Sequence, residues 1–326
     1  MHTSVFRARL QSQRWLLSLA CLLMVAEANA LTRTEILPFS TVAMSDQQLL
    51  RGKGGEPTGI AGVLKLPAES NNPVVVVLYG AGGYGDYLDD WITLLNQQGI
   101  GTFVVDSTSG RIDGVDSEQG QMRQLAVIRD AYAALELLSN HPGVDRQRIA
   151  LLGFSKAGQG ALYAAMQRMQ KLYAPAQAQF AGVVAFYPNC TVRYRDDEQL
   201  IGSPVWIFHG EADEQNAFQP CNDYVQRASS AGAQIHMIGY PGVRHGFDWP
   251  TSNSSLSAAT PAMSGCDIRE EVKGLLINKA TGRLFRFDDA CVKPAGSARF
   301  DASAFADVKR QVPVLFSRLF GLQHRE

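Results

Sequence analysis

The chain has 326 residues, of which 46% are hydrophobic, and its formal net charge is −1. A chain of this kind can bury the core of a single α/β domain of roughly 250 to 300 residues. The near-neutral charge, without a block of Lys or Arg, argues against a nucleic-acid binder, so we expect a small-molecule partner.

The first thirty residues are typical of a secretory signal peptide. Three arginines precede an apolar run over residues 15–26, which is short for a bilayer crossing, and an Ala-Asn-Ala sequence ends at Ala30. Small residues at this spacing indicate a cleavage site. We therefore expect cleavage after Ala30 and export to the bacterial periplasm or beyond, with no stable membrane anchor afterwards. An uncleaved anchor is the alternative.

Strand-like runs alternate with helix-like segments along the rest of the chain. The run at 74–79 is continuous and β-branched, as in parallel strands buried on both faces. The predicted strands are residues 60–66, 74–79, 102–105, 149–154, 183–186, 205–208 and 235–240. The predicted helices are residues 88–98, 122–138, 157–169 and 217–229. This alternation predicts an α/β fold with a mostly parallel, doubly wound sheet flanked by helices.

Residues 251–300 interrupt this alternation. The segment begins Ser-rich, and residues 275–287 are typical of a hairpin with a Gly-containing turn. We interpret the segment as an insertion within one domain over residues 31–326, and not as a second domain. An amphipathic helix is predicted after it, over residues 302–320.

Ser155 is the strongest candidate nucleophile. It is the centre of a G-x-S-x-A sequence between a predicted strand and a predicted helix. A serine on such a sharp turn is held exposed, and small residues on either side let strand and helix approach. Ala157 takes a position that is more often Gly. This context predicts a nucleophile elbow.

A serine hydroxyl needs a base, and the base needs an acid that orients it. Where a strand-to-helix elbow carries the serine, the chain order is Ser, acid, His. The histidines after Ser155 are His209, His236, His245 and His324. The first precedes the acid loop, the second lies in a predicted strand, and the last is at the tail. His245, in a Gly-punctuated loop after the last strand, is therefore the predicted base, with a surface histidine as the alternative.

The acid should follow the strand that precedes the base. Asp213 lies there, with Glu211 and Glu214 as rivals, and Asp223 and Asp248 are weaker candidates. The short spacing after a glycine favours Asp213. A solvated acidic loop is the alternative.

A glycine-rich loop at residues 79–84 follows the first buried strand. Acyl transfer needs N–H donors where negative charge develops. The N–H groups of Ala81 or Gly82, together with that of Lys156, are the predicted oxyanion hole. The glycine spacing does not match a phosphate-binding loop.

Four cysteines follow the predicted signal peptide, an even number that suits an oxidising compartment. Of the three connectivities we favour Cys190–Cys221 and Cys266–Cys291, because each closes a local loop beside a predicted catalytic element. Four reduced cysteines are the alternative. No Cys or His spacing suggests a metal site.

Several stretches together resemble the dienelactone hydrolase family, in particular its exported members with a serine nucleophile. They are residues 74–83, 105–107 with Arg111 downstream, 148–160, 186–190, 204–213 and 240–247. The resemblance spans most of the mature chain to about residue 248 and resumes over 291–319. It implies a small α/β-hydrolase with a Ser or Cys, Asp and His triad that acts on esters or lactones without a cofactor. Family members named for dienelactone cleavage carry cysteine as nucleophile, so Ser155 points away from dienelactone itself.

The leading hypothesis is hydrolysis of a carboxylic ester or lactone through an acyl-enzyme. Two alternatives remain. One is a serine peptidase of related fold, although no propeller or long extra domain is present to select peptides. The other is a non-catalytic binding protein, although all three triad positions are occupied. Tyr84 and Arg111 are candidates for substrate contact.

Overall fold

The computed structural model describes residues 33–68, 70–108, 125–176, 178–252 and 261–322. The predicted signal peptide therefore lies outside the described residues. The chain from Thr32 to Glu326 forms one compact unit. Within the described ranges, no helix combines the length and the apolar character that a bilayer crossing needs.

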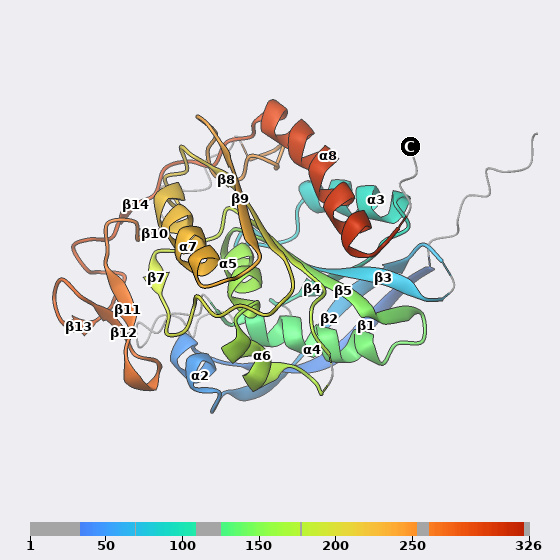
Figure 1. Ribbon diagram of the computed structural model, residues 1–326, viewed down its shortest axis with the longest axis horizontal. Helices are drawn as coiled ribbons and strands as arrows, with labels where there is room; N and C mark the ends of the chain where they lie inside the picture. Colours follow the sequence, from blue (N-terminus) through green and yellow to red (C-terminus); the bar gives the residue numbers. More distant parts are fainter. Residues whose placement is uncertain (1–32, 69, 109–124, 177, 253–260, 323–326) are drawn as a thin grey trace, which may run out of the picture. The chain divides into compact units, whose positions relative to one another are not determined.

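An eight-stranded sheet forms the centre of the fold, in the order β1-β2-β4-β3-β5-β6-β8-β9 (Figure 1). The strands from β4 to β9 in this order are parallel, whereas β1 and β2 pair antiparallel. Their bounds are β1 (Arg33–Ala43), β2 (Glu56–Leu66), β3 (Asn72–Leu78), β4 (Gly101–Asp106), β5 (Val144–Phe154), β6 (Val183–Phe186), β8 (Val205–Gly210) and β9 (Ile235–Tyr240). The predicted strands are present, and the mostly parallel sheet is confirmed.

Strand β3 shows how the sequence produces this sheet. All of its residues are buried. Val74, Val76 and Leu78 belong to one apolar cluster, and Val75 and Val77 belong to a second cluster on the other face. Because successive side chains of a strand point to opposite faces, a continuous run of valines needs cover on both sides.

Helices supply that cover (Figure 1). Buried residues of α4, α5, α6 and α7 join the first cluster, and those of α3 and α8 join the second. The helix bounds are α2 (Asp46–Arg51), α3 (Asp86–Gln97), α4 (Val127–Ser139), α5 (Ser155–Ala164), α6 (Gln167–Tyr173), α7 (Phe218–Ser230) and α8 (Ala302–Leu319). The two apolar layers hold the carboxyl ends of the strands in place, and in a sheet of this type those ends carry the site.

The segment predicted as one helix over residues 157–169 is two helices, α5 and α6. Between them the carbonyl oxygen of Ala165 accepts a hydrogen bond from the Ile201 N–H at 2.8 Å. Met166 forms a β-bridge with Leu200. Backbone groups that pair with a distant segment are not free for the helix, so the helix ends there. The apolar period continues across the break, and the sequence alone did not indicate it.

Strand β1 and helix α2 were not predicted. Strand β1 pairs with β2 along its whole length at the edge of the sheet. Pro38 lies within it, and proline is tolerated in strands at such edges. Helix α2 carries a signal that sequence reasoning missed: Ser45 and Gln48 form a capping box.

The insertion forms two small sheets, one of which includes β7 from the loop after β6. Their strands are β7 (Val192–Arg193), β10 (Pro261–Ala262), β11 (Ile268–Glu270), β12 (Leu276–Asn278), β13 (Arg283–Leu284) and β14 (Lys293–Pro294). The predicted hairpin is present as β12 and β13. Strand β11 pairs parallel with β7, which ties the insertion to the loop after β6. The disulfide Cys266–Cys291 links two parts of the insertion, as expected from the sequence.

Candidate active site

Ser155 lies on the turn between β5 and α5 and has a φ of +54°, a left-handed conformation that is uncommon for a residue with a side chain. Close packing holds this backbone in place. A Cβ on Gly153 would lie 2.3 Å from the Ala157 carbonyl oxygen, and one on Gly158 would lie 2.5 Å from that of Phe186. The strand and the helix therefore approach each other as a nucleophile elbow requires.

Three side chains that are far apart in sequence meet at this turn. The Oγ of Ser155 lies 2.9 Å from Nε2 of His245, and Nδ1 of His245 lies 2.7 Å from Oδ2 of Asp213. The other carboxylate oxygen of Asp213 accepts hydrogen bonds from the Gln215 and Asn216 N–H groups at 2.8 and 2.9 Å. A proton on Nδ1 of His245 leaves Nε2 able to accept the serine proton.

The loop that carries Asp213 and the loop that carries His245 are joined by backbone hydrogen bonds. The N–H of Ala212 donates to the Val243 carbonyl oxygen at 2.9 Å, and the N–H of Glu211 donates to that of Tyr240 at 3.0 Å. A Cβ on Gly210 would lie 2.3 Å from the Val243 carbonyl oxygen. The side chains of Asp213 and His245 are 0% and 8% exposed, so their contact is shielded from water.

The rival acids and histidines have other surroundings. Glu214 is largely exposed and faces Arg244 at 3.5 Å, and Glu211 is also exposed. His209 is buried between backbone carbonyl oxygens, and this burial lowers its pKa. His236 is exposed on β9. Asp223 is exposed on α7 beside Gln219, and His324 lies outside the described residues.

The predicted oxyanion loop lies against Ser155. A Cβ on Gly80 would lie 3.0 Å from the Cβ of Ser155, and the Gly83 N–H closes a turn onto the Gly80 carbonyl oxygen at 3.1 Å. Neither Ala81 nor Gly82 donates its N–H to a described residue. Lys156 is in the first turn of α5, where N–H groups have no partner within the helix.

An aromatic pair borders the same loop. The rings of Trp249 and Tyr87 lie 5.1 Å apart, and a Cβ on Gly82 would lie 3.0 Å from the Trp249 ring. The indole N–H of Trp249 donates to Asp86 at 2.9 Å. Trp249 is thereby held over the loop.

The two predicted substrate contacts have different outcomes. Tyr84 is 54% exposed, and its hydroxyl donates to Asp89 at 2.5 Å. Partial burial and the nearby Asp89 carboxylate raise the pKa of Tyr84 to about 12. Arg111 lies outside the described residues.

Asp248, which the sequence offers only as a weaker candidate for the acid, is a buried carboxylate near His245. Asp248 is fully buried and accepts hydrogen bonds from the Tyr187 hydroxyl at 2.6 Å and the Trp91 indole at 3.0 Å. Burial raises the pKa of Asp248. The Tyr187 ring lies 4.5 Å from the ring of His245, so it packs against one side of the imidazole. The only sequence signal is an acidic residue between Phe247 and Trp249.

Asp248→Ala should lower the free energy of unfolding by about 2–4 kcal/mol, because two buried donors lose their acceptor and a small cavity opens. Asp248→Asn retains one acceptor oxygen and should cost less. Urea unfolding of the three proteins, followed by Trp fluorescence, measures the difference. An Ala variant as stable as the parent would contradict the assigned contacts.

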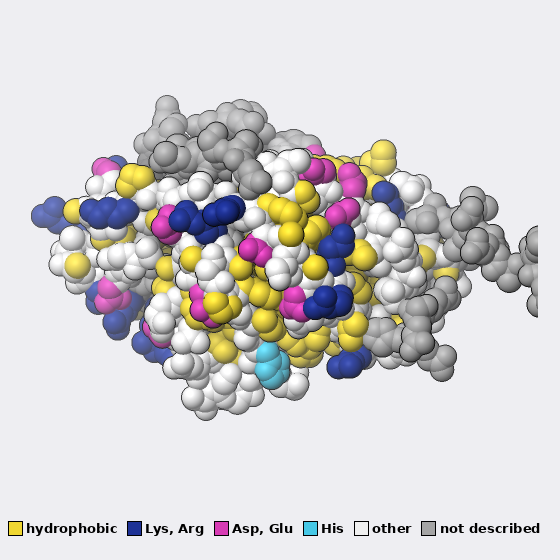
Figure 2. Space-filling view, turned by 90° about the horizontal axis from the view of Figure 1, so that it is seen from above, with side chains coloured by type: hydrophobic (Ala, Val, Ile, Leu, Met, Phe, Trp, Pro, Cys, Tyr) yellow, Lys and Arg dark blue, Asp and Glu magenta, His cyan; other side chains and the backbone are white. Residues whose placement is uncertain are grey.

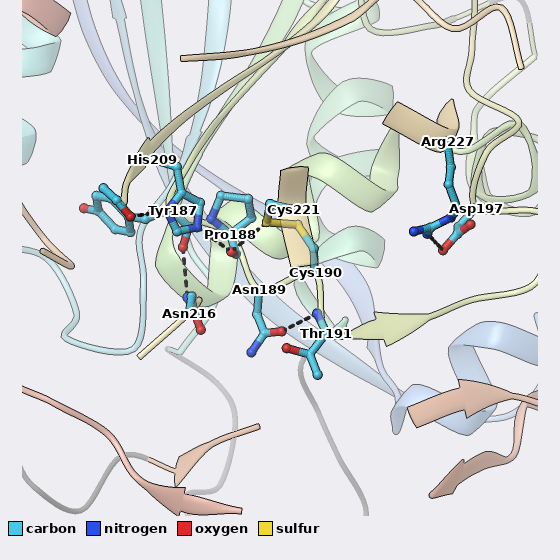
Figure 3. Close-up of a disulfide and its surroundings, with 11 residues drawn as sticks. Tyr187, Pro188, Asn189, Cys190, Thr191, Asp197, His209, Asn216, Cys221 and Arg227 are labelled. Atoms are coloured by element: carbon cyan, nitrogen blue, oxygen red, sulfur yellow. Dashed lines mark hydrogen bonds and ion pairs between the residues drawn. A yellow bond between two sulfur atoms is a disulfide. The ribbon is translucent and has the colours of Figure 1, made fainter. Parts of the chain in front are cut away.

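The Cys190–Cys221 disulfide lies beside Pro188, in the loop that also carries Tyr187 (Figure 3). It joins the loop after β6 to α7. In that loop the Pro188 carbonyl oxygen lies 3.3 Å from Nε2 of His209, and the Asn216 side chain donates to the Tyr187 carbonyl oxygen at 2.9 Å. The disulfide thus anchors the loop that places the Tyr187 ring against His245.

A variant with Ala at both Cys190 and Cys221 should lose about 3–4 kcal/mol of stability, because the closed loop is 31 residues long. Below its unfolding temperature, its activity at the candidate site should also fall, because the Tyr187 loop loosens. The matched control is the double Ala variant at Cys266 and Cys291, whose loop is 25 residues long and lies in the insertion. Equal activity loss in both would show that the first disulfide has no particular role at the site.

Among the described residues, no group of three or more His, Cys, Asp and Glu side chains is placed to hold a metal ion. The side chains that do meet are a hydroxyl, an imidazole and a carboxylate, with free N–H groups nearby. Such an arrangement can activate an oxygen nucleophile and stabilise an oxyanion.

Comparisons with known proteins identify the family and the fold. The model of the dienelactone hydrolase family matches residues 60–264. A dienelactone hydrolase-like promiscuous phosphotriesterase from metagenomic libraries superposes with a TM-score of 0.57 at 18% identity, covering 88% of this chain and 98% of its own. A dienelactone hydrolase candidate from Klebsiella pneumoniae gives 0.53 at 16% identity, covering 87% and 99%. No curated protein matches the chain. The expected α/β-hydrolase fold is confirmed.

Proposed function

The chain belongs to the dienelactone hydrolase family and is a hydrolase of ester bonds, and from this premise we propose that it is a serine hydrolase acting through an acyl-enzyme. Its substrate would be a small carboxylic ester or lactone. The proposal is supported by two consecutive side-chain contacts: Ser155 Oγ lies 2.9 Å from His245 Nε2, and His245 Nδ1 lies 2.7 Å from Asp213 Oδ2. Ser155 itself has a left-handed backbone conformation.

In the first step the Oγ of Ser155 attacks the carbonyl carbon while Nε2 of His245 takes its proton. The imidazolium that forms is stabilised by Asp213, which remains ionised. Two backbone N–H groups already hold the second oxygen of Asp213, so its carboxylate is fixed in the orientation that the base needs. The serine Oγ and the carbonyl carbon form a new bond, and the carbonyl oxygen becomes an oxyanion.

The oxyanion would be held by the N–H of Lys156 and by that of Ala81 or Gly82. The first lies at the start of α5, where the helix dipole also favours negative charge. The second comes from the loop that packs against Ser155 through Gly80. Donors fixed in this way before reaction stabilise the transition state without reorganisation.

Collapse of the tetrahedral intermediate breaks the ester C–O bond, and His245 returns its proton to the departing alcohol. Water then enters, gives a proton to His245 and attacks the acyl carbon. A second collapse restores the Ser155 hydroxyl and releases the acid. For a lactone both products remain one molecule, a hydroxy acid. Trp249, which packs on the buried Tyr87 over the loop, would contact an apolar group of the substrate.

We also propose that the protein is exported, after cleavage following Ala30. Two disulfides are typical of proteins in an oxidising compartment. Mass spectrometry of the protein isolated from the periplasm or the medium tests this. A mature protein that begins at Leu31 is the expected result, whereas an intact N-terminus in the cytoplasmic fraction would contradict it.

The function is tested with a short-chain aryl ester and the matching anilide, given to purified mature protein in parallel. We expect turnover of the ester, much slower turnover of the anilide, and labelling of Ser155 by a fluorophosphonate probe. Preference for the anilide would favour a peptidase. A folded protein with neither turnover nor labelling would favour a binding protein that retains the fold.

A further inference from the structure

A cavity of about 420 Å³ lies where α2 and α6 end. Gly274 of the insertion also lines it, and Figure 1 shows α2 on the side of the molecule where the insertion lies. Five basic side chains and no acidic one line the cavity, together with Leu50, Leu172 and Gly274. The basic residues are Arg51, Lys53, Arg168, Lys171 and Arg195. None of these residues belongs to the candidate active site.

One of the five charges is already balanced and forms part of the structure. Arg168 binds the buried Glu270 through both guanidinium NH₂ groups, at 2.8 and 2.7 Å, and also donates to the Leu50 carbonyl oxygen. Glu270 further accepts from the Arg195 N–H at 3.0 Å. This bidentate pair fixes the wall of the cavity and connects α6, α2 and the insertion.

The other four cations form no ion pair with a described residue: Arg51, Lys53, Lys171 and Arg195. Arg51 and Lys171 are in the last turns of their helices, where positive charge stabilises the helix dipole. Lys53 and Arg195 have no such role. Arg195 also lines a neighbouring cavity of about 250 Å³ that contains several carboxylates.

The chain has 31 acidic and 30 basic residues. A cavity whose charged lining residues are all basic therefore differs from the nearly equal numbers of acidic and basic residues in the whole chain. Across the centre of the face seen in Figure 2, basic and acidic side chains are interspersed. A concave site lined by one sign of charge concentrates oppositely charged ligands. Two phosphate groups near pH 7 carry about two negative charges as diesters and about three to four as monoesters, which four unpaired cations can balance.

From this balance of charge we propose that the cavity, of about 420 Å³, binds a small anion with at least two phosphate groups. The phosphate groups belong either to a soluble compound of metabolite size or to a lipid headgroup, because the basic side chains would bind the phosphates of both in the same way. The binding is separate from ester hydrolysis and does not depend on the proposed triad.

Titration calorimetry of the full mature protein with inorganic pyrophosphate at low salt tests the proposal. The pocket variant is Lys53→Gln with Lys171→Gln, and both side chains are exposed. The control is Arg283→Gln with Lys293→Gln, which removes two exposed charges from the insertion. We expect affinity roughly tenfold weaker in the pocket variant and unchanged in the control, with ester turnover equal in all three.

A second arm uses phosphatidylcholine vesicles with and without cardiolipin, whose headgroup carries two phosphates. If the parent and the control variant bind pyrophosphate and the pocket variant does not, the ligand is a soluble compound. Cardiolipin-dependent vesicle binding with the same loss, without pyrophosphate binding, supports a headgroup. Absence of binding in both arms, or equal loss in pocket and control variants, would overturn the proposal.

Discussion

Replacement of Ser155 by alanine should reduce kcat/KM for the aryl ester by about 10⁴-fold to 10⁶-fold, because the attacking oxygen is removed and, among the described residues, no other hydroxyl forms a hydrogen bond with His245. The remaining rate would reflect the oxyanion donors and binding alone. The hydroxyl makes no other hydrogen bond in the described structure, so the melting temperature should change little. Steady-state kinetics and thermal unfolding measure both effects.

The matched control is Ser230→Ala, at the exposed end of α7. It makes the same chemical change far from the elbow in sequence and should leave kcat/KM unaltered. A Ser155→Ala variant that retains more than a few per cent of the activity would rule out the serine as nucleophile. Equal loss in both variants would indicate damage to the preparation.

Asp213→Asn should reduce kcat by about 10³-fold to 10⁴-fold, with little change in KM. An amide at this position no longer selects the tautomer with the proton on Nδ1 of His245, and it no longer stabilises the imidazolium. The two backbone N–H groups that hold Oδ1 still find an acceptor in the Asn side chain. The loop should therefore keep its shape, and circular dichroism should match that of the parent.

The rival acids provide the controls for this experiment. Glu214→Gln and Glu211→Gln alter exposed side chains in the same loop and should leave kcat within about twofold of the parent. Loss of activity in one of these variants, with a functional Asp213→Asn protein, would contradict the assignment of the acid. All three residues lie in one stretch of four positions, so the three variants alter the same loop and differ only in which carboxylate is removed.

The sequence predicted the parts of the site that depend on local pattern. Ser155 lies at a strand-to-helix junction with small neighbours, and His245 and Asp213 each follow a recognisable strand. Chain order then selected among several histidines. The choice between Asp213 and Glu214 depended on loop geometry, and the structure separates them by burial and by distance to the imidazole.

The parts that escaped prediction depend on contacts between distant residues. Asp248 is separated by 61 residues from Tyr187 and by 157 from Trp91, so nothing in its neighbourhood indicated a buried carboxylate with two donors. The break between α5 and α6 arises in the same way, since Ala165 and Met166 pair with a segment outside the helix. Periodicity reports which face of a helix is apolar, but not where a partner strand interrupts it.

The central claim is the acyl-enzyme on Ser155, and rapid-mixing kinetics with an activated aryl ester tests it most directly. We expect a burst of the phenol product equal to the enzyme concentration, and an intact mass raised by one acyl group that maps to the Ser155 peptide. A linear time course at substantial turnover, with no acylated protein after rapid quenching at any substrate concentration, would contradict the account.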